Sequence, residues 1–107
     1  GSVEYTYDGN GHLVSKEGPD SLISYFYNSE GSLIKTREER KDEIWETEYR
    51  DGKVYSTSIY DPSFLLKSVR VTLSDGTYEE TRYIDGVKRY VFHLDKDGER
   101  ILEARGL

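Results

Sequence analysis

The sequence predicts an all-β protein, a meander of about ten short antiparallel strands joined by hairpin turns, forming a single twisted sheet or one curled into an open barrel. Three observations predict this fold. Apolar and polar residues alternate along much of the chain, as on strands with two different faces. Turn-forming residues interrupt the alternation at short intervals. Glycines recur at a spacing of about 21 residues, which indicates an internal repeat.

The alternating segments are rich in β-branched and aromatic residues, which suit a pleated surface. Near the N-terminus Val3, Tyr5 and Tyr7 occupy every second position. The segment 87–94 has apolar residues on both faces. The strands predicted most directly lie within 3–7, 23–27, 44–49, 65–73 and 87–94.

Nine turn signals separate these segments and set the expected number of strands. Asp-Gly and Asn-Gly steps tolerate the positive φ of tight hairpin turns, and an Asp side chain accepts hydrogen bonds from backbone N–H groups two residues on. The signals are DGNG at Asp8, EGPD at Glu17, NSEG at Asn28, RKDE at Arg40, DG at Asp51, DPS at Asp61, DG at Asp75, DG at Asp85 and DKDG at Asp95.

One segment, 35–49, is rich enough in Glu, Arg and Lys to suggest a helix. Its apolar residues are only Ile44, Trp45 and Tyr49, which are too few for an apolar stripe along a helix of that length. We therefore predict a strand, a charged turn over 40–42, and a second strand.

The repeat is visible in Gly11, Gly31, Gly52, Gly76 and Gly98, which are 20, 21, 24 and 22 residues apart. Each interval holds about two strands and two turns, so the chain contains about five hairpins. A single hairpin is marginally stable, and several in one sheet stabilise each other. We expect residues 3–107 to form one β-repeat domain. The first two residues read as a remnant of expression, and the chain as a piece of something longer.

Composition excludes several classes of function. The net charge is −6, whereas nucleic-acid binding and attachment to anionic lipid call for basic surfaces. Cysteine is absent, so disulfides and thiolate chemistry are excluded. No apolar run approaches the length of a membrane span. Aromatic residues make up 13% of the chain, which favours a folded domain over disorder.

Two segments carry a family resemblance. YTYDGNGHLVSK at 5–16 and YFYNSEGSLIK at 25–35 resemble the YD repeat, also called the RHS repeat, with Asn28 in place of the usual Asp. The resemblance is good over 3–38, weak over 45–60 and partial over 69–103. The segment DGTYEETRYIDGVKRY at 75–90 equally resembles the hairpins of MORN-type repeat variants.

The YD-repeat resemblance implies a strip of antiparallel hairpins that can coil into a shell. Large members of this family enclose toxins or form extracellular scaffolds that bind glycans or partner proteins. The repeats of the family hold no active site, so the resemblance implies no catalytic residue here. Five hairpins are too few for a shell, so the resemblance implies a segment of one or a small independent sheet.

The candidates for chemistry are few, and we expect no catalytic residue, metal site or cofactor. The only histidines, His12 and His93, lie in different segments, and a zinc site would need them together with a further ligand. Asp95, Asp97 and Glu99 resemble the start of a calcium loop but lack its distal Glu, so we interpret them as a hairpin turn. No Ser lies in a nucleophile-elbow motif.

The aromatic residues are the best candidates for binding. Their rings could line one face of the sheet beside Asp, Asn and Glu, as a site for sugar rings or an extended peptide. The alternative is that they form the core, because the chain has few aliphatic residues. The candidate ligand-binding residues are Tyr25, Tyr27, Trp45, Tyr49, Tyr55 and Tyr60.

Three functions remain open. The first is a non-catalytic scaffold or binding module of YD-repeat type, part of a larger cell-envelope or secreted protein, that presents an aromatic face to a glycan or a protein. The second is a small ligand-binding β-barrel. The third is an antitoxin-like or immunity protein that binds a basic partner.

The edges of the sheet carry a further expectation. Unprotected edge strands pair with other chains, so we expect either a homodimer through the sheet edges or charged residues that protect them. The segment 98–107 holds Glu and Arg residues that suit this protective role.

Overall fold

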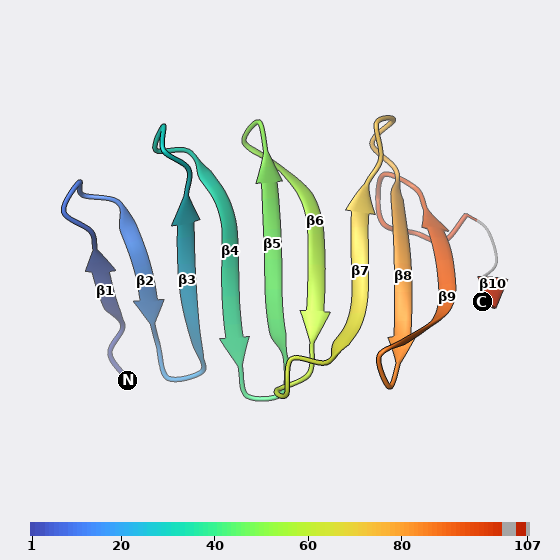
Figure 1. The fold of residues 1–107 in the computed structure, drawn as a ribbon, viewed down its shortest axis with the longest axis horizontal. Helices are drawn as coiled ribbons and strands as arrows, with labels where there is room; N and C mark the ends of the chain where they lie inside the picture. The colour runs from blue at the N-terminus through green and yellow to red at the C-terminus, as the bar shows by residue number, and fades with distance from the viewer. Residues whose placement is uncertain (102–104, 107) are drawn as a thin grey trace.

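The fold is known from a computed structural model that describes residues 1–101 and 105–106. Ten strands form one sheet in which every strand pairs antiparallel with its neighbours in the chain (Figure 1). The strands are β1 (Glu4–Tyr7), β2 (Leu13–Glu17), β3 (Ser21–Tyr27), β4 (Leu33–Arg40), β5 (Ile44–Arg50), β6 (Lys53–Tyr60), β7 (Leu66–Thr72), β8 (Tyr78–Ile84), β9 (Val87–Leu94) and β10 (Arg105–Gly106). The predicted all-β hairpin meander is confirmed.

The sheet is not closed into a barrel, so of the two expected shapes the single sheet is the one observed, and the small ligand-binding barrel would need a closure that this fold lacks. In Figure 1, β1 and β10 lie at opposite ends of the sheet, and they do not pair. A small barrel needs an apolar inner face to fill its interior. Among the described residues the buried apolar side chains are Ile44, Phe92 and Leu94. These side chains are too few to fill the interior of a barrel.

The sheet is a single layer, which gives the molecule an extended shape. Its Cα radius of gyration is 15.9 Å, compared with about 13 Å for a compact domain of this length. No side chain in the described part of the chain falls below 2% exposure. Pairing between neighbouring strands, and not packing between two layers, therefore provides most of the contacts in this fold.

The register divides the side chains between two faces. We call them the Trp45 face and the Ile44 face, after two adjacent residues of β5. One row on the Trp45 face runs across nine strands through Tyr5, Lys16, Ile23, Glu38, Trp45, Ile59, Ser68, Arg82 and Tyr90. A parallel row on the Ile44 face runs through Thr6, Ser15, Ser24, Arg37, Glu46, Ser58, Val69, Thr81 and Val91.

One five-residue turn recurs in five places. The backbone N–H of its first residue donates to the carbonyl of its fifth residue, and the carbonyl of the first residue accepts the N–H of the fourth. In the first copy these are the bonds from Asp8 to His12 at 2.9 Å and from Gly11 to Asp8 at 3.1 Å. In four copies the first side chain also accepts the third and fifth N–H groups. The copies are 8–12, 28–32, 61–65, 73–77 and 95–99.

The glycine spacing predicted that Gly52 marks the third copy of the repeat, but the third copy of the five-residue turn is at 61–65. Phe64, with φ of 64°, occupies the position that Gly31 holds at 84° in the second copy. Gly52 instead belongs to a two-residue turn with Asp51, in which both residues have positive φ, and Asp85–Gly86 forms another. Both two-residue turns match the primed geometry that suits hairpins.

The segment 35–49, for which a helix was the alternative, is a strand, a turn and a strand, as predicted. β4 ends at Arg40 and β5 begins at Ile44, and the N–H of Arg40 donates to the carbonyl of Glu43 at 2.9 Å. The expectation that 98–107 protects an edge lies partly outside the described residues. Within this segment the described residues Arg105 and Gly106 form β10, which pairs with Val91 and Tyr90 of β9.

Candidate functional site

The six candidate aromatic residues do not all share one face. Trp45 and Tyr49 follow the alternation of β5, and Tyr25 joins their face because Tyr25 pairs with Thr36, which pairs with Thr47. Tyr60 pairs directly with Ile44 and therefore lies on the Ile44 face. The structure thus brings some of the candidates together and separates others.

Tyr55 lies at a β-bulge and, in the described structure, has no cross-strand partner on β5. The register of β5 and β6 shifts between Glu48 and Tyr49, and Tyr55 is the extra residue on β6. The guanidinium carbon of Arg50 lies 3.5 Å from the centre of the Tyr55 ring. Arg50 therefore covers one face of this ring.

Four tyrosines form a cluster on the Trp45 face that we call the tyrosine patch: Tyr5, Tyr25, Tyr27 and Tyr49. Burial raises the pKa of Tyr25 above its usual value, and the neighbouring Tyr27, Tyr5 and Tyr49 raise it further. The Tyr27 hydroxyl donates to the carbonyl of Leu13 at 2.7 Å. The patch joins β1, β3 and β5, which are every second strand in one half of the sheet.

Neighbouring side chains fix two rings of the patch. His12 stacks on Tyr27, with ring centres 4.8 Å apart and an angle of 25° between the planes. The Lys16 amine lies 5.9 Å from the centre of the Tyr5 ring, and Tyr5 remains 53% exposed. The sequence indicated Tyr25, Tyr27 and Tyr49, and it missed the contribution of Tyr5. The repeated phrase Y-x-Y was the signal that could have added it.

Trp45 belongs to a network of charged groups. Its indole N–H donates to Glu43 at 3.1 Å, and the guanidinium carbon of Arg40 lies 4.5 Å from its ring centre. Glu43 also accepts a bond of 2.7 Å from the Lys67 amine, and these bonds from Lys67 and Trp45 lower the Glu43 pKa. Arg40 pairs with Glu38 at 3.0 Å.

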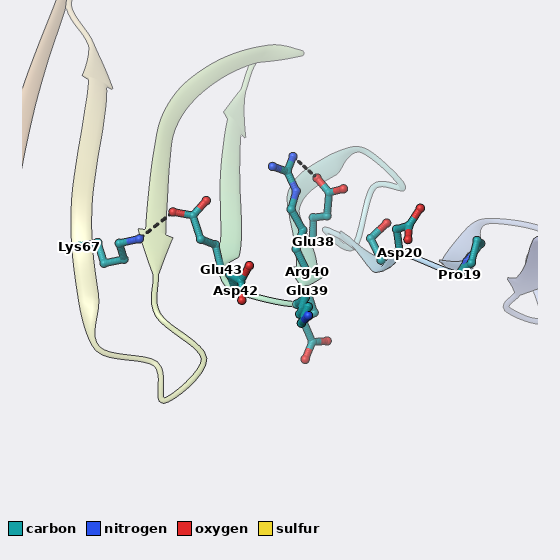
Figure 2. A pocket seen from close by; sticks show the side chains of 10 residues that line it. Pro19, Asp20, Glu38, Glu39, Arg40, Asp42, Glu43 and Lys67 are labelled. Carbon is teal, nitrogen blue, oxygen red and sulfur yellow. Dashed lines mark hydrogen bonds and ion pairs between the residues drawn. The ribbon is translucent and has the colours of Figure 1, made fainter.

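Figure 2 shows the open depression that these charged groups border, beside the turn that carries Pro19 and the turn at 40–43. Both ion pairs, Lys67 with Glu43 and Arg40 with Glu38, lie along it. Five carboxylates and three basic groups line the depression: Asp20, Glu38, Glu39, Asp42, Glu43, Arg40, Lys41 and Lys67. Its net charge is therefore −2.

A second depression lies on the Trp45 face over β6 to β9 and was not predicted. Glu80 accepts bonds of 2.8 and 3.0 Å from Arg70 and one of 2.9 Å from Arg82. Burial raises the pKa of Glu80, but the hydrogen bonds from the two arginines outweigh this effect and hold the pKa below its usual value. Arg82 and Arg100 lie over the buried ring of Phe92. Arg70, Glu80 and Phe92 are brought together by the cross-strand register, which the sequence pattern alone does not reveal.

On the Ile44 face Tyr60 lies beside another ion pair. Burial raises the pKa of Tyr60, and Glu46, to which it is hydrogen-bonded, raises it further. Arg37 donates to Glu46 at 2.7 Å, and the Lys35 amine lies 3.7 Å away. Tyr60 therefore has charged neighbours and not the other candidate rings.

The residues considered for metal binding form local structure. His12 lies 3.5 Å from Asp8 in the first turn, whereas His93 lies on β9 in the other half of the sheet. The Asp95 carboxylate accepts N–H groups of Asp97 and Glu99, both at 2.9 Å. Within 1–101 and 105–106, no three His, Cys, Asp or Glu side chains are grouped to hold a metal ion.

No protein-family model matches the chain, and no curated protein has a matching sequence. The described residues include no helix that is long and apolar enough to cross a membrane.

Proposed function

We propose that this chain is a non-catalytic binding module that presents the tyrosine patch to a glycan or a protein partner. The observation that carries the proposal is the gathering of four tyrosines on one face of a single-layer sheet. In a two-layer fold such rings would pack against the second layer. Here Tyr5 is 53% exposed, and the other three are partly exposed.

The chemistry of the patch suits sugar rings and extended peptides. Tyrosine offers a flat apolar surface and a hydroxyl that both donates and accepts hydrogen bonds. Lys16 and Glu38 flank Ile23 in the row on the Trp45 face. The Lys16 amine lies over the Tyr5 ring, and burial, together with the charge of Glu38, raises the pKa of Tyr25, so polar groups border the rings. Aromatic surface with a few polar groups around it is typical of carbohydrate and peptide sites.

We further propose that the module is of YD-repeat type and belongs to a larger cell-envelope or secreted protein. The recurring five-residue turn supports the first part of this proposal, the repeat type. In the copies at Asp8 and Asn28 the side-chain oxygen accepts the same two N–H groups. These are the turns of the two segments that resemble the YD repeat. The shared role of Asp8 and Asn28 in the two turns gives that sequence pattern a structural reason.

The test is a binding screen followed by mapping of the bound surface. The purified chain is applied to an oligosaccharide array and to a library of extended peptides, and each hit is titrated by NMR. We expect shifts at Tyr25, Tyr27 and Tyr49, and at least a tenfold loss of affinity in Tyr49→Ser. Tyr90→Ser is the matched control, because Tyr90 lies on the same face but on β9. Absence of any hit, or shifts confined to β7–β9, would contradict the proposal.

A second candidate, an immunity protein for a basic partner, is favoured by the acidic depression in Figure 2. Its net charge of −2 is part of the overall −6, and a depression with this excess of carboxylates would attract a cationic surface. Titration with oligolysine tests this candidate. Binding that weakens with salt and with Glu39→Gln would support it, and unchanged spectra would exclude it. Glu79→Gln, on a strand remote from the depression, is the control.

A further inference from the structure

The outer edge of β1 has no partner in the described structure. β1 lies at one end of the sheet in Figure 1 and pairs only with β2. All four of its residues are exposed. The apolar side chains along it are also exposed, at 43% for Val3, 53% for Tyr5 and 59% for Tyr7. The edge therefore combines unpaired backbone with apolar surface.

The backbone groups that point outward can be assigned from the first turn. The N–H of Asp8 donates inward to the carbonyl of His12 at 2.9 Å. Backbone groups alternate in direction along a strand, so those of Thr6 and Glu4 also point toward β2. The N–H and C=O groups of Val3, Tyr5 and Tyr7 consequently point away from the sheet, where another strand can bond to them.

The usual protection of an edge is weak on β1. Proteins protect edge strands with Lys, Pro, bulges or inward-pointing charges. The segment 3–7 has neither Lys nor Pro, and Glu4 is its only charged residue. The bulge between β1 and β2 lies at its end, beside Tyr7, and leaves 4–6 regular.

We propose that the β1 edges of two copies of this chain pair antiparallel about a two-fold axis at Tyr5. Tyr5 then faces the partner's Tyr5, Val3 faces the partner's Tyr7, and Glu4 faces the partner's Thr6. All outward-pointing groups of Val3, Tyr5 and Tyr7 meet their counterparts, which gives about six backbone hydrogen bonds. The pairing joins two sheets into one continuous sheet.

Charge selects this register over its neighbours. An axis at Glu4 would place the two Glu4 carboxylates opposite each other. An axis at Thr6 would place Glu4 opposite the partner's Asp8. Like charges directly opposite across strands are destabilising, whereas aromatic and β-branched pairs are favourable. Among these three registers, only the Tyr5 axis combines apolar pairs with no carboxylate pair.

The pairing would also join the two tyrosine patches, because Tyr5 lies on the Trp45 face. The inference concerns the chain of residues 1–107 and does not depend on the proposed binding function, since an edge can pair whether or not the patch binds a ligand. The contact is short and much smaller than the ~800 Å² per partner of stable interfaces. We therefore expect a weak, reversible dimer that forms as the protein concentration rises.

A charge exchange at the axis tests the proposal. In sedimentation at rising concentration, Tyr5→Lys and Tyr5→Glu are each expected to remain monomeric, because like charges would face each other across the axis. An equal mixture of the two is expected to dimerise at least as well as the unaltered chain. Tyr90→Lys, at a similarly exposed tyrosine of the same face, serves as the control and should dimerise as the unaltered chain does.

Amide hydrogen exchange on the unaltered chain gives a second readout that needs no variant. The N–H groups of Tyr5 and Tyr7 should gain protection with concentration, whereas the inward-pointing N–H of Thr6 should change little. A chain that stays monomeric at millimolar concentration would overturn the proposal. So would dimerisation of Tyr5→Lys alone, or protection that does not rise at Tyr5.

Discussion

At the scale of single residues, the five-residue turn depends on one position with positive φ. Four copies place Gly there, and the copy at 61–65 places Phe64 at φ of 64°. A residue with a side chain is strained in this conformation by about 1–2 kcal/mol. The hydrogen bonds from Ser63 and Leu65 to Asp61 still form, at 2.8 and 3.0 Å. The side-chain acceptor thus maintains the turn without Gly.

Gly31→Ala is expected to destabilise the protein by about 1–2 kcal/mol. Its φ is 84°, and a new Cβ would approach His12 Nε2 at 3.3 Å, on the ring that stacks with Tyr27. Gly9→Ala is the control, because its Cβ would meet no atom within 4 Å and its φ is not in the positive region. Urea unfolding of both variants measures the difference. Equal loss of stability in both would contradict the assignment of the turn.

Phe64→Gly is expected to have the opposite effect and to stabilise the protein by about 0.5–1 kcal/mol. Relief of the positive φ outweighs the extra entropy of Gly in the unfolded chain. The side chain is 53% exposed, so little buried contact is lost. The Phe64 ring lies 6.1 Å from the Tyr60 ring and 5.9 Å from the guanidinium carbon of Arg37. A lower melting temperature than that of the unaltered chain would show that these contacts matter more than the strain.

At the scale of strands and hairpins, alternation and turn residues were enough to predict the meander, because both are local. Local patterns could not predict which residues meet across the sheet. β-bulges shift the register in several hairpins, including those at Glu48/Tyr49 and Ile59/Tyr60. A count of every second residue does not survive such a shift, which is why the place of Tyr55 could not be predicted. Tyr60 is separated from Trp45 for another reason, because it pairs with Ile44 in the regular part of the same hairpin. The contacts of Glu80 with Arg70 and Arg82 depend on register in the same way.

Glu80→Gln is expected to lower the free energy of unfolding by about 1–2 kcal/mol at pH 7, since it weakens the bonds from Arg70 and Arg82, both exposed in part. The matched control is Glu79→Gln, because Glu79 lies on the opposite face of β8 and no ion pair involves it in the described structure.

The effect of Glu80 should depend on pH. The pKa of Glu80 is lower in the folded protein than in the unfolded chain, where it is about 4.3. Its contribution to stability is therefore complete above about pH 5 and disappears as the pH falls through the folded value. The difference in unfolding free energy between Glu80→Gln and the unaltered chain should thus shrink from pH 7 to pH 3. A difference that is independent of pH would contradict the ion-pair assignment.

At the scale of the whole molecule, a chain with 34% charged residues forms a sheet with two wetted faces. Cross-strand ion pairs occur on both faces, through Glu46 on one and Glu80 on the other. A sheet without a second layer also keeps its tyrosines accessible and its edge available for pairing. The proposed binding function and the proposed dimer both follow from this single-layer architecture.

Small-angle X-ray scattering from the monomer tests the single-layer sheet most directly. The Tyr5→Lys variant, or the unaltered chain at low concentration, avoids the proposed dimer. The structure predicts a radius of gyration near its Cα value of 15.9 Å and an elongated distance distribution that matches its longest extent of 47 Å. A value of about 13 Å, that of a compact domain, would contradict the open sheet.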